Sequence, residues 1–170
     1  MDSRLEKTVN VLQQQASATF EEFLDEVHVF VPADKLVDTL LFLRDEHEFS
    51  LLSVLTAIDY WPQDRPRFHV VYGLTSLTQK IVLQVRVLLD GESPKVPTVT
   101  GVFETANWRE RELFDMFGIE VEGHPDPRRI LMPSDWEGHP LRRDYPLGYE
   151  EPQFTFNYKE IDLRKPYVKE

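Results

Sequence analysis

The densest group of ionisable side chains lies between residues 109 and 115. It consists of Arg109, Glu110, Arg111, Glu112 and Asp115. On a helix, Arg111 and Asp115 would share one face at a spacing of four, and Glu112 and Asp115 at a spacing of three. Paired carboxylates could perform acid–base chemistry in a cleft, but no neighbouring pattern predicts a cleft. The alternative is a solvated, ion-paired helix surface.

A second group could hold a metal ion. His124, Asp126 and His139, with Asp135 or Glu137, offer the imidazole and carboxylate ligands that suit zinc or non-haem iron, and would make the protein a small metalloenzyme. However, each histidine precedes a proline, and neither lies in a predicted helix or strand that would make the side chains converge. The alternative is that both imidazoles make hydrogen bonds that hold the shape of this segment.

Two basic doublets follow in an otherwise acidic protein, Arg128–Arg129 and Arg142–Arg143. They could bind phosphate, lipid head groups or the carboxylates of a partner. Acidic residues between positions 124 and 145 balance them, which favours specific ion pairs. Cysteine is absent, so disulfides, thiolate zinc sites, cysteine-ligated iron–sulfur clusters and cysteine nucleophiles are excluded. There is also no glycine-rich phosphate loop and no nucleophile-elbow motif.

The elements that position these groups follow from hydrophobic periodicity. Apolar residues at helical spacing predict a helix over 5–16, and period-two alternation predicts a strand over 27–31 that ends at Pro32. A broad apolar face after Pro32 predicts a second helix to about His47. Alternating residues at 68–74 and 81–89 predict two hairpin strands. A further helix should begin near Thr105 or Asn107 and end at Gly118.

The run 49–60 is almost continuously apolar, too rich on both faces for a half-exposed strand, and we predict a central strand for it. The order of elements indicates an α+β fold, with a mostly antiparallel four-stranded sheet and helices on one face. The predicted division is an α+β domain over 1–118, followed by an extended segment over 119–170, within a single structural domain overall.

Residues 118–148 contain five of the twelve prolines and four of the seven glycines. We call residues 119–147 the C-terminal arm and residues 148–170 the tail. The arm should be extended, because the residue before each proline is disfavoured in helix, and it should be sticky because it contains Trp136, Leu141 and Tyr145. It therefore needs a surface, either on its own domain or on a partner. Alternation at 154–158 predicts that the tail adds a strand to some surface.

Composition narrows the class of protein. With 170 residues, 41% of them hydrophobic, the chain suits one domain with a sizeable core. A formal charge of −11 opposes nucleic-acid binding. The acidic start, with Asp2 and Glu6, is unlike a secretory or transit peptide, so we expect the protein to stay where it is translated. The most apolar window is about half the length needed to cross a bilayer.

Three stretches carry a resemblance to a known family. They are ERELFDMFGI at 110–119, then His124 with Arg128, and LRRDYPL at 141–147. With the lead-in ANW at 106–108 and LTAIDY at 55–60, they closely resemble the signature of the 30 kDa subunit family of respiratory complex I.

The resemblance implies a peripheral membrane protein on the cytoplasmic side of the bacterial inner membrane. It would be a non-catalytic hydrophilic subunit of proton-translocating NADH:quinone oxidoreductase. It would dock against the D subunit of that complex, the forty-nine-kilodalton type, near the quinone-reducing module and beside cluster-bearing subunits. FMN and the iron–sulfur clusters would belong to those partners, with no cofactor in this chain. The alternative within the same resemblance is the equivalent subunit of a membrane-bound hydrogenase or another quinone-reducing complex.

The resemblance assigns structural and interface roles to the matching residues, and catalysis to none of them. We expect Trp136, Leu141 and Tyr145 to be apolar anchors on the partner, and the arginine doublets to pair with partner carboxylates. The full set of signature and interface residues is Glu110, Arg111, Glu112, Asp115, His124, Arg128, Arg129, Trp136, Leu141, Arg142, Arg143, Asp144 and Tyr145.

Overall fold

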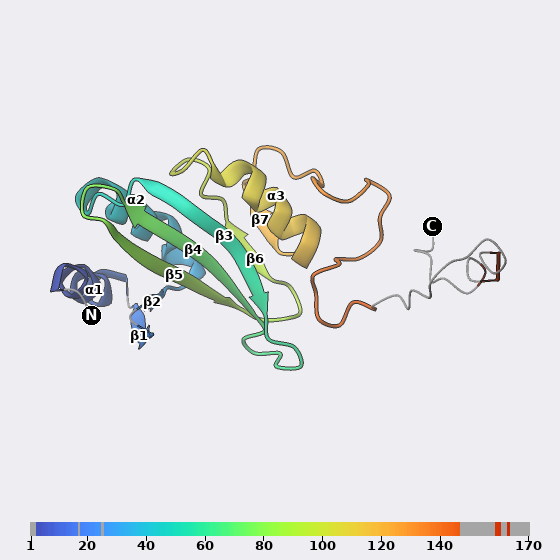
Figure 1. Ribbon diagram of the computed structural model, residues 1–170, viewed down its shortest axis with the longest axis horizontal. Coiled ribbons are helices and arrows are strands. Elements are labelled where there is room, and N and C mark those ends of the chain that lie inside the picture. The colour runs from blue at the N-terminus through green and yellow to red at the C-terminus, as the bar shows by residue number, and fades with distance from the viewer. Residues whose placement is uncertain (1–2, 17, 25, 147–158, 161–162, 164–170) are drawn as a thin grey trace.

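The computed structural model describes residues 3–16, 18–24, 26–146, 159–160 and 163. The predicted strand at 154–158 lies outside them. In chain order the elements are α1 (Ser3–Ala16), β1 (Thr19–Phe23), β2 (Glu26–Phe30), the 3-10 turn η1 (Ala33–Lys35), α2 (Leu36–Glu46), β3 (Leu51–Asp59), β4 (Phe68–Ser76), β5 (Ile81–Leu89), β6 (Lys95–Pro97), α3 (Ala106–Phe117) and β7 (Glu120–Glu122). The predicted α+β class is confirmed (Figure 1). None of the described helices has the length and apolar character needed to cross a membrane.

The main sheet has five strands in the order β1-β2-β5-β4-β3. The prediction of a mostly antiparallel sheet is confirmed, since only β2 and β5 pair in parallel. The predicted count of four strands is wrong, because it leaves out β1. All five residues of β1 are exposed, so no buried alternation marks it in the sequence. Its pairing with β2 is what makes it a strand.

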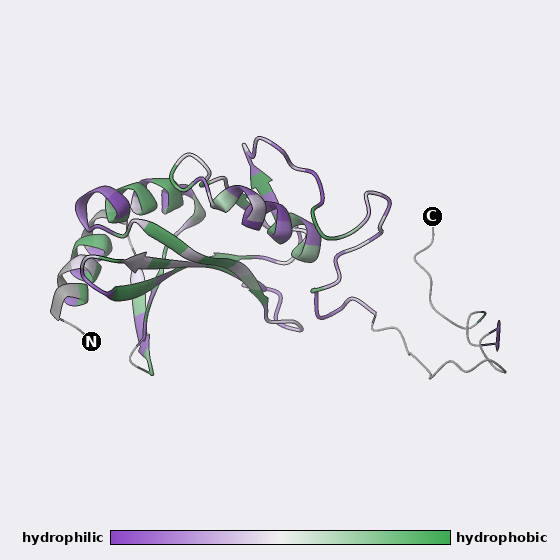
Figure 2. Ribbon diagram, turned by 45° about the horizontal axis from the view of Figure 1, so that its top comes forward, coloured by the Kyte–Doolittle hydropathy of each residue, from purple (hydrophilic) through white to green (hydrophobic). Residues whose placement is uncertain are grey.

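The prediction of a central position for residues 49–60 is also wrong, because β3 is an edge strand. Leu55 and Ala57 of β3 are buried, but Val54 and Ile58 on its other face are 42% and 37% exposed. The apolar residues on both faces suggested two covering layers. In the described part of the chain, the helices cover only one face of the sheet (Figure 2).

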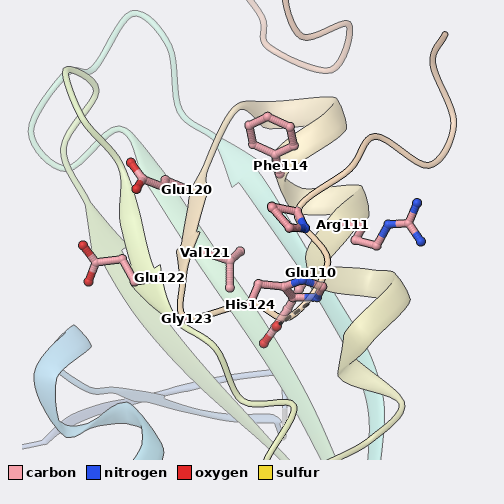
Figure 3. Close-up of a pocket in the computed structure, with 9 residues that line it drawn as sticks. Glu110, Arg111, Phe114, Glu120, Val121, Glu122, Gly123 and His124 are labelled. Atoms are coloured by element: carbon pink, nitrogen blue, oxygen red, sulfur yellow. Dashed lines mark ion pairs between the residues drawn. The ribbon is translucent and has the colours of Figure 1, made fainter. Parts of the chain in front are cut away.

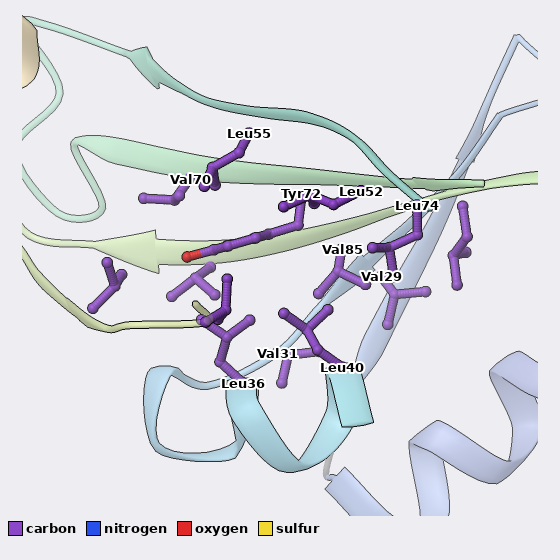
Figure 4. Close-up of a cluster of buried hydrophobic side chains, with 14 of the residues drawn as sticks. Val29, Val31, Leu36, Leu40, Leu52, Leu55, Val70, Tyr72, Leu74 and Val85 are labelled. Atoms are coloured by element: carbon purple, nitrogen blue, oxygen red, sulfur yellow. The ribbon is translucent and has the colours of Figure 1, made fainter. Parts of the chain in front are cut away.

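The core fills the space between that covered face and the helices. Leu36 and Leu40 of α2 lie against Tyr72, Leu74 and Val85 of the sheet (Figure 4). Apolar residues of α1 and α3 join the same cluster. Each fully buried aliphatic side chain stabilises the fold by about 1.5–3 kcal/mol. The prediction of helices on one face is confirmed.

A second, two-stranded sheet joins the start of the C-terminal arm to the domain. β7 pairs in parallel with β6, with Lys95 opposite Glu120, and Ile119 is fully buried. Gly118 ends α3 in the left-handed conformation, at φ 67°. The first residues after Gly118 are therefore part of the folded unit, and the arm then curls around the C-terminal end of α3 (Figure 1).

Candidate functional site

The charged face of α3 is not the solvated surface that one interpretation expected. Glu110 is only 1% exposed. Its carboxylate accepts hydrogen bonds from the Val99 backbone N–H and the Thr98 hydroxyl, both at 2.6 Å. Burial raises the pKa of Glu110, although these hydrogen bonds oppose the rise. Glu110 thus fastens α3 to the chain that follows β6.

His124 lies beside Glu110, with 3.6 Å between the imidazole Nε2 and the carboxylate. The backbone N–H of Asp126 donates to Nδ1 at 3.0 Å, so Nε2 carries the ring proton and donates to the Asn107 carbonyl at 3.0 Å. The predicted hydrogen-bonding role of this histidine is therefore observed. The imidazole holds the turn after β7 against the first turn of α3.

A cavity of about 280 Å³ opens next to this pair, between α3 and β7 (Figure 3). Phe114, Val121 and Pro127 supply much of its apolar wall. The side chains of Glu120 and Glu122 point away from α3, and Lys95 pairs with both of them. Among the residues that the structure describes, no three histidine, cysteine or acidic side chains are grouped to hold a metal ion.

Asp115 is the centre of the contact between α3 and the C-terminal arm. Its carboxylate is fully buried and accepts hydrogen bonds from three consecutive backbone N–H groups, those of residues 130, 131 and 132, at 3.1, 2.7 and 2.9 Å. Arg129 donates to the other carboxylate oxygen at 2.6 Å. Burial alone would raise the pKa of Asp115, but the four donors outweigh it and the pKa is lowered. The ionised carboxylate thus fixes the backbone of residues 130–132.

Two arginines and a histidine extend this contact along the arm. Arg111 donates to the carbonyls of Arg128 and Arg129, both at 2.9 Å. Arg129 also donates to the carbonyl of Trp136 at 2.9 Å. His139 Nδ1 donates to the backbone carbonyl of Asp115 at 3.0 Å, which is the second hydrogen-bonding role expected for a histidine. Side chains of α3 and the arm therefore satisfy each other's backbone groups.

The end of the described arm is held by a buried arginine that the sequence did not mark as functional. Arg67 is 5% exposed and makes two hydrogen bonds to Asp59 and two to Asp144, and these raise its pKa. The backbone N–H of Arg143 donates to Asp59 at 2.9 Å. The one signal for this cluster was Asp59, a carboxylate at the end of an apolar run.

The arginine doublets correct one expectation. Arg129 pairs with Asp115, Arg128 pairs with Asp126 at 2.7 Å, and Arg142 donates to the carbonyls of residues 117 and 118. The hydrogen bonds from Arg128 lower the pKa of Asp126 to about 2. The hypothesis that both doublets bind partner carboxylates is therefore wrong for these three arginines, whose acceptors lie in this chain. The guanidinium of Arg143 is exposed and makes one long contact, 3.5 Å to the carbonyl of Trp61.

The other signature residues fall into two groups. Trp136 and Tyr145 are half-buried against their own chain, whereas Leu141 is 51% exposed. Glu112 is half-buried and makes no hydrogen bond or ion pair with the residues that the structure describes. The domain itself thus provides much of the surface that the arm needs.

Residues 29–151 match the family described as "Respiratory-chain NADH dehydrogenase, 30 Kd subunit". This match covers the sheet, α3 and the C-terminal arm. The chain belongs to this family. Within it, the C subunit of NADH-quinone oxidoreductase from Roseiflexus sp. (strain RS-1) is 49% identical over 151 residues, which are 88% of this chain and 86% of the relative. The protein of the same name from Geobacter sulfurreducens is 44% identical over 126 residues, 74% of this chain and 78% of that one.

Two solved structures place this family member among known folds. "Nqo5 of the trypsin-resistant fragment (1-134)" has a TM-score of 0.65 and 34% identity, covering 72% of this chain and 98% of that one. A chain of the membrane-bound sulfane sulfur reductase, an archaeal respiratory membrane complex, has a TM-score of 0.72 over 99% of this chain and 97% of its own. At 22% identity the second likeness concerns the fold alone.

Proposed function

We propose that this chain is a non-catalytic, hydrophilic subunit of the peripheral arm of proton-translocating NADH:quinone oxidoreductase, on the cytoplasmic side of the bacterial inner membrane. The observation that carries the proposal is the family match, which spans both the domain and the C-terminal arm. The geometry agrees with it, because the buried groups Glu110, Asp115 and Arg67 all hold the arm on the domain. FMN and the iron–sulfur clusters belong to partner subunits, and this chain holds no cofactor of its own.

Within that complex, the C-terminal arm docks against the D subunit and supports electron transfer from NADH to quinone. The arm is held in one course by its contacts with α3, so little conformational entropy is lost when a partner binds. Its outer side presents Leu131, 61% exposed, Leu141 and the exposed guanidinium of Arg143. Apolar anchors beside an arginine are typical of the energetic centre of an interface.

The test is affinity purification of the tagged protein from mildly solubilised native membranes. Companions are identified by mass spectrometry and the eluate is assayed for NADH:quinone activity. We expect the D subunit, cluster-bearing subunits and activity. Hydrogenase-type or sulfur-reductase companions would assign the chain to a related assembly. A protein recovered alone with stoichiometric metal would overturn the proposal and favour a metalloenzyme.

The docking of the arm is tested separately in the same preparation. Leu141→Ser with Arg143→Ala removes two outward-facing groups that have no structural role on the domain. We expect recovery of the D subunit to fall at least about fivefold. Leu77→Ser, in the β4–β5 turn and 64% exposed, is the matched control and should recover it normally. Unchanged recovery with the double variant would refute docking through this side of the arm.

A further inference from the structure

The face of the sheet opposite the helices carries apolar side chains that no described residue covers. Val54 and Ile58 of β3 are joined there by Val82 and Leu88 of β5, which are 57% and 42% exposed. We call this side of β2, β5, β4 and β3 the open face (Figure 2). Strand alternation and register place these residues on it: His28, Phe30, Leu51, Val54, Thr56, Ile58, His69, Val71, Gly73, Thr75, Val82, Gln84, Arg86 and Leu88.

A cation without a carboxylate partner lies at the centre of the open face. Arg86 Nη2 donates to Gln84 Oε1 at 3.1 Å and to His28 Nε2 at 3.3 Å. The nearby carboxylate of Glu26 accepts from Gln84 at 2.7 Å and pairs with His28, and it forms no ion pair with Arg86. The Arg86 Nε atom is buried and has no acceptor among the described residues.

His69, diagonal to Arg86 across β4 and β5, has a second buried atom without a partner, its Nδ1. The imidazole packs on Tyr60 at 4.3 Å between ring centroids and meets Phe30 edge-on at 6.3 Å. Buried polar atoms without a partner are rare in native proteins, and each one requires an explanation. Here two of them are neighbours on the same uncovered face, which points to a ligand that completes both.

We infer that the open face binds a neighbouring subunit through a carboxylate that is set in an apolar surface and pairs with Arg86. This inference rests on the proposed function, because it assigns the partner to the same complex. A carboxylate can accept two parallel hydrogen bonds from a guanidinium, which would give Arg86 Nε its acceptor. The surrounding apolar side chains exclude water from the pair and supply buried area.

Charge decides against other occupants. The chain carries a formal charge of −11, and Glu26 lies beside the cationic centre, so a polyanion such as nucleic acid would be repelled. A second copy of this chain, docked by two-fold symmetry on the same patch, would bring two Arg86 side chains together. A partner that presents one carboxylate within an apolar surface meets both the charge and the exposed aliphatic groups.

Photo-cross-linking in the purified native complex tests the occupant. A benzophenone amino acid is placed at Ile58 on the open face, and at Asp38 on the outer surface of α2 as the control for nonspecific capture. We expect a cross-link from Ile58 to another subunit, at a peptide that contains Asp or Glu among apolar residues. A cross-link to a second copy of this chain, or none while the chain is in the complex, would overturn the inference. Failure of the chain to join any complex would instead overturn the proposed function.

Charge reversal tests the role of Arg86. Tagged Arg86→Glu and wild-type chains are co-expressed, and their ratio in the purified complex is compared with that in the lysate. We expect Arg86→Glu to be depleted at least about tenfold, because like charges would meet at the interface. Lys80→Glu, an equal charge change in the β4–β5 turn, should not be depleted.

A folding control separates docking from stability. Thermal unfolding of each full-length chain is measured alone, and Arg86→Gln is included because it removes the charge with a smaller change in the sheet. We expect Arg86→Gln to unfold within a few degrees of the parent and still to be depleted from the complex. Normal incorporation of a folded Arg86→Gln chain would overturn the assignment of a carboxylate partner.

Discussion

Asp115 lies near the end of α3 with its carboxylate fully buried, and four donors from residues 129–132 converge on it. Three of these donors are backbone groups that would otherwise lack a hydrogen bond. A buried, unpaired backbone N–H is costly, so this carboxylate determines the path of the segment after Arg128. Glu110 does the same at the start of α3, for the chain that follows β6.

Substitution of Asp115 by asparagine keeps the shape of the side chain but turns one acceptor oxygen into a donor and removes the charge beside Arg129. We expect Asp115→Asn to lower the free energy of unfolding by about 3 kcal/mol, measured in urea. Glu112→Gln, on the same helix, should change it by less than about 0.5 kcal/mol. A loss under about 1 kcal/mol for Asp115→Asn would contradict the central role of this carboxylate.

Glu110 predicts an opposite dependence on pH. Burial raises its pKa, so the folded chain binds this proton more tightly than the unfolded chain, in which the pKa of glutamate is about 4.3. Its contribution to stability is therefore present at low pH and is lost as the pH rises through the folded pKa. Glu110→Gln removes this loss, so the variant should gain stability relative to the parent between about pH 4 and pH 8 in urea titrations.

Glu110→Ala separates this charge effect from the hydrogen bonds. Alanine leaves the Val99 N–H and the Thr98 hydroxyl without an acceptor, at a cost of about 2–4 kcal/mol. This loss should exceed that of Glu110→Gln at every pH. Equal stability of the two variants would mean that the two hydrogen bonds contribute little.

At the scale of elements, α3 and the C-terminal arm complete each other. The last carbonyls of a helix lack partners within it, and here Arg142 from the arm donates to those of residues 117 and 118. A cation at this position also favours the negative end of the helix. The helix therefore ends properly only when the arm is in place.

Gly118 tests this junction. Its φ of 67° is unfavourable for other residues, and a Cβ atom would collide with the His139 ring and the Arg142 guanidinium. We expect Gly118→Ala to destabilise the chain by about 2–3 kcal/mol and to increase proteolysis of the arm. Gly101→Ala is the matched control, since a Cβ atom there meets nothing within 4 Å. A similar small effect of both substitutions would contradict the close packing at Gly118.

At the scale of the whole molecule, Arg67 joins residues far apart in sequence. It links Asp59 at the end of β3 to Asp144 near the end of the described arm. Burial alone would raise the pKa of Asp59, but hydrogen bonds from Arg67 and from the backbone of Arg143 and Trp61 outweigh it and the pKa is lowered. The hydrogen bonds from Arg67 also lower the pKa of Asp144.

These lowered pKa values predict that the end of the arm is released in acid. Carboxylates with a folded pKa below the unfolded value of about 3.9 stabilise the fold above about pH 4, and this contribution is lost as the pH falls through the folded pKa. Hydrogen exchange of the Arg143 amide, corrected for its intrinsic pH dependence, should lose protection below about pH 4 before the amides of β4 do. Simultaneous loss in both would contradict a local release.

Arg67→Met should produce the same release at neutral pH, because it leaves the buried Asp59 unpaired, at a cost of about 3–5 kcal/mol. Arg65→Met, two residues away and largely exposed, is the control and should leave exchange unchanged. Retained protection at Arg143 in the Arg67→Met chain would refute the link between sheet and arm.

Local patterns in the sequence determined most of the elements. Period-two and helical spacing predicted the three helices and four of the five main strands, because those segments bury one face and their apolar residues record it. The signature between Glu110 and Leu147 identified the family before any geometry was known. It also marked Asp115, His124 and the arginines as structural.

Only the tertiary structure decided what those residues contact. β1 is exposed along its length and exists through pairing with β2, so no local pattern marks it. The apolar run of β3 recorded two faces, but only the fold shows that one of them is open. The partners of Asp115, Arg129 and Arg67 lie between 8 and 77 residues away in sequence. Ion pairs of that separation depend on how the chain returns to itself, and side-chain types along the sequence do not encode that path.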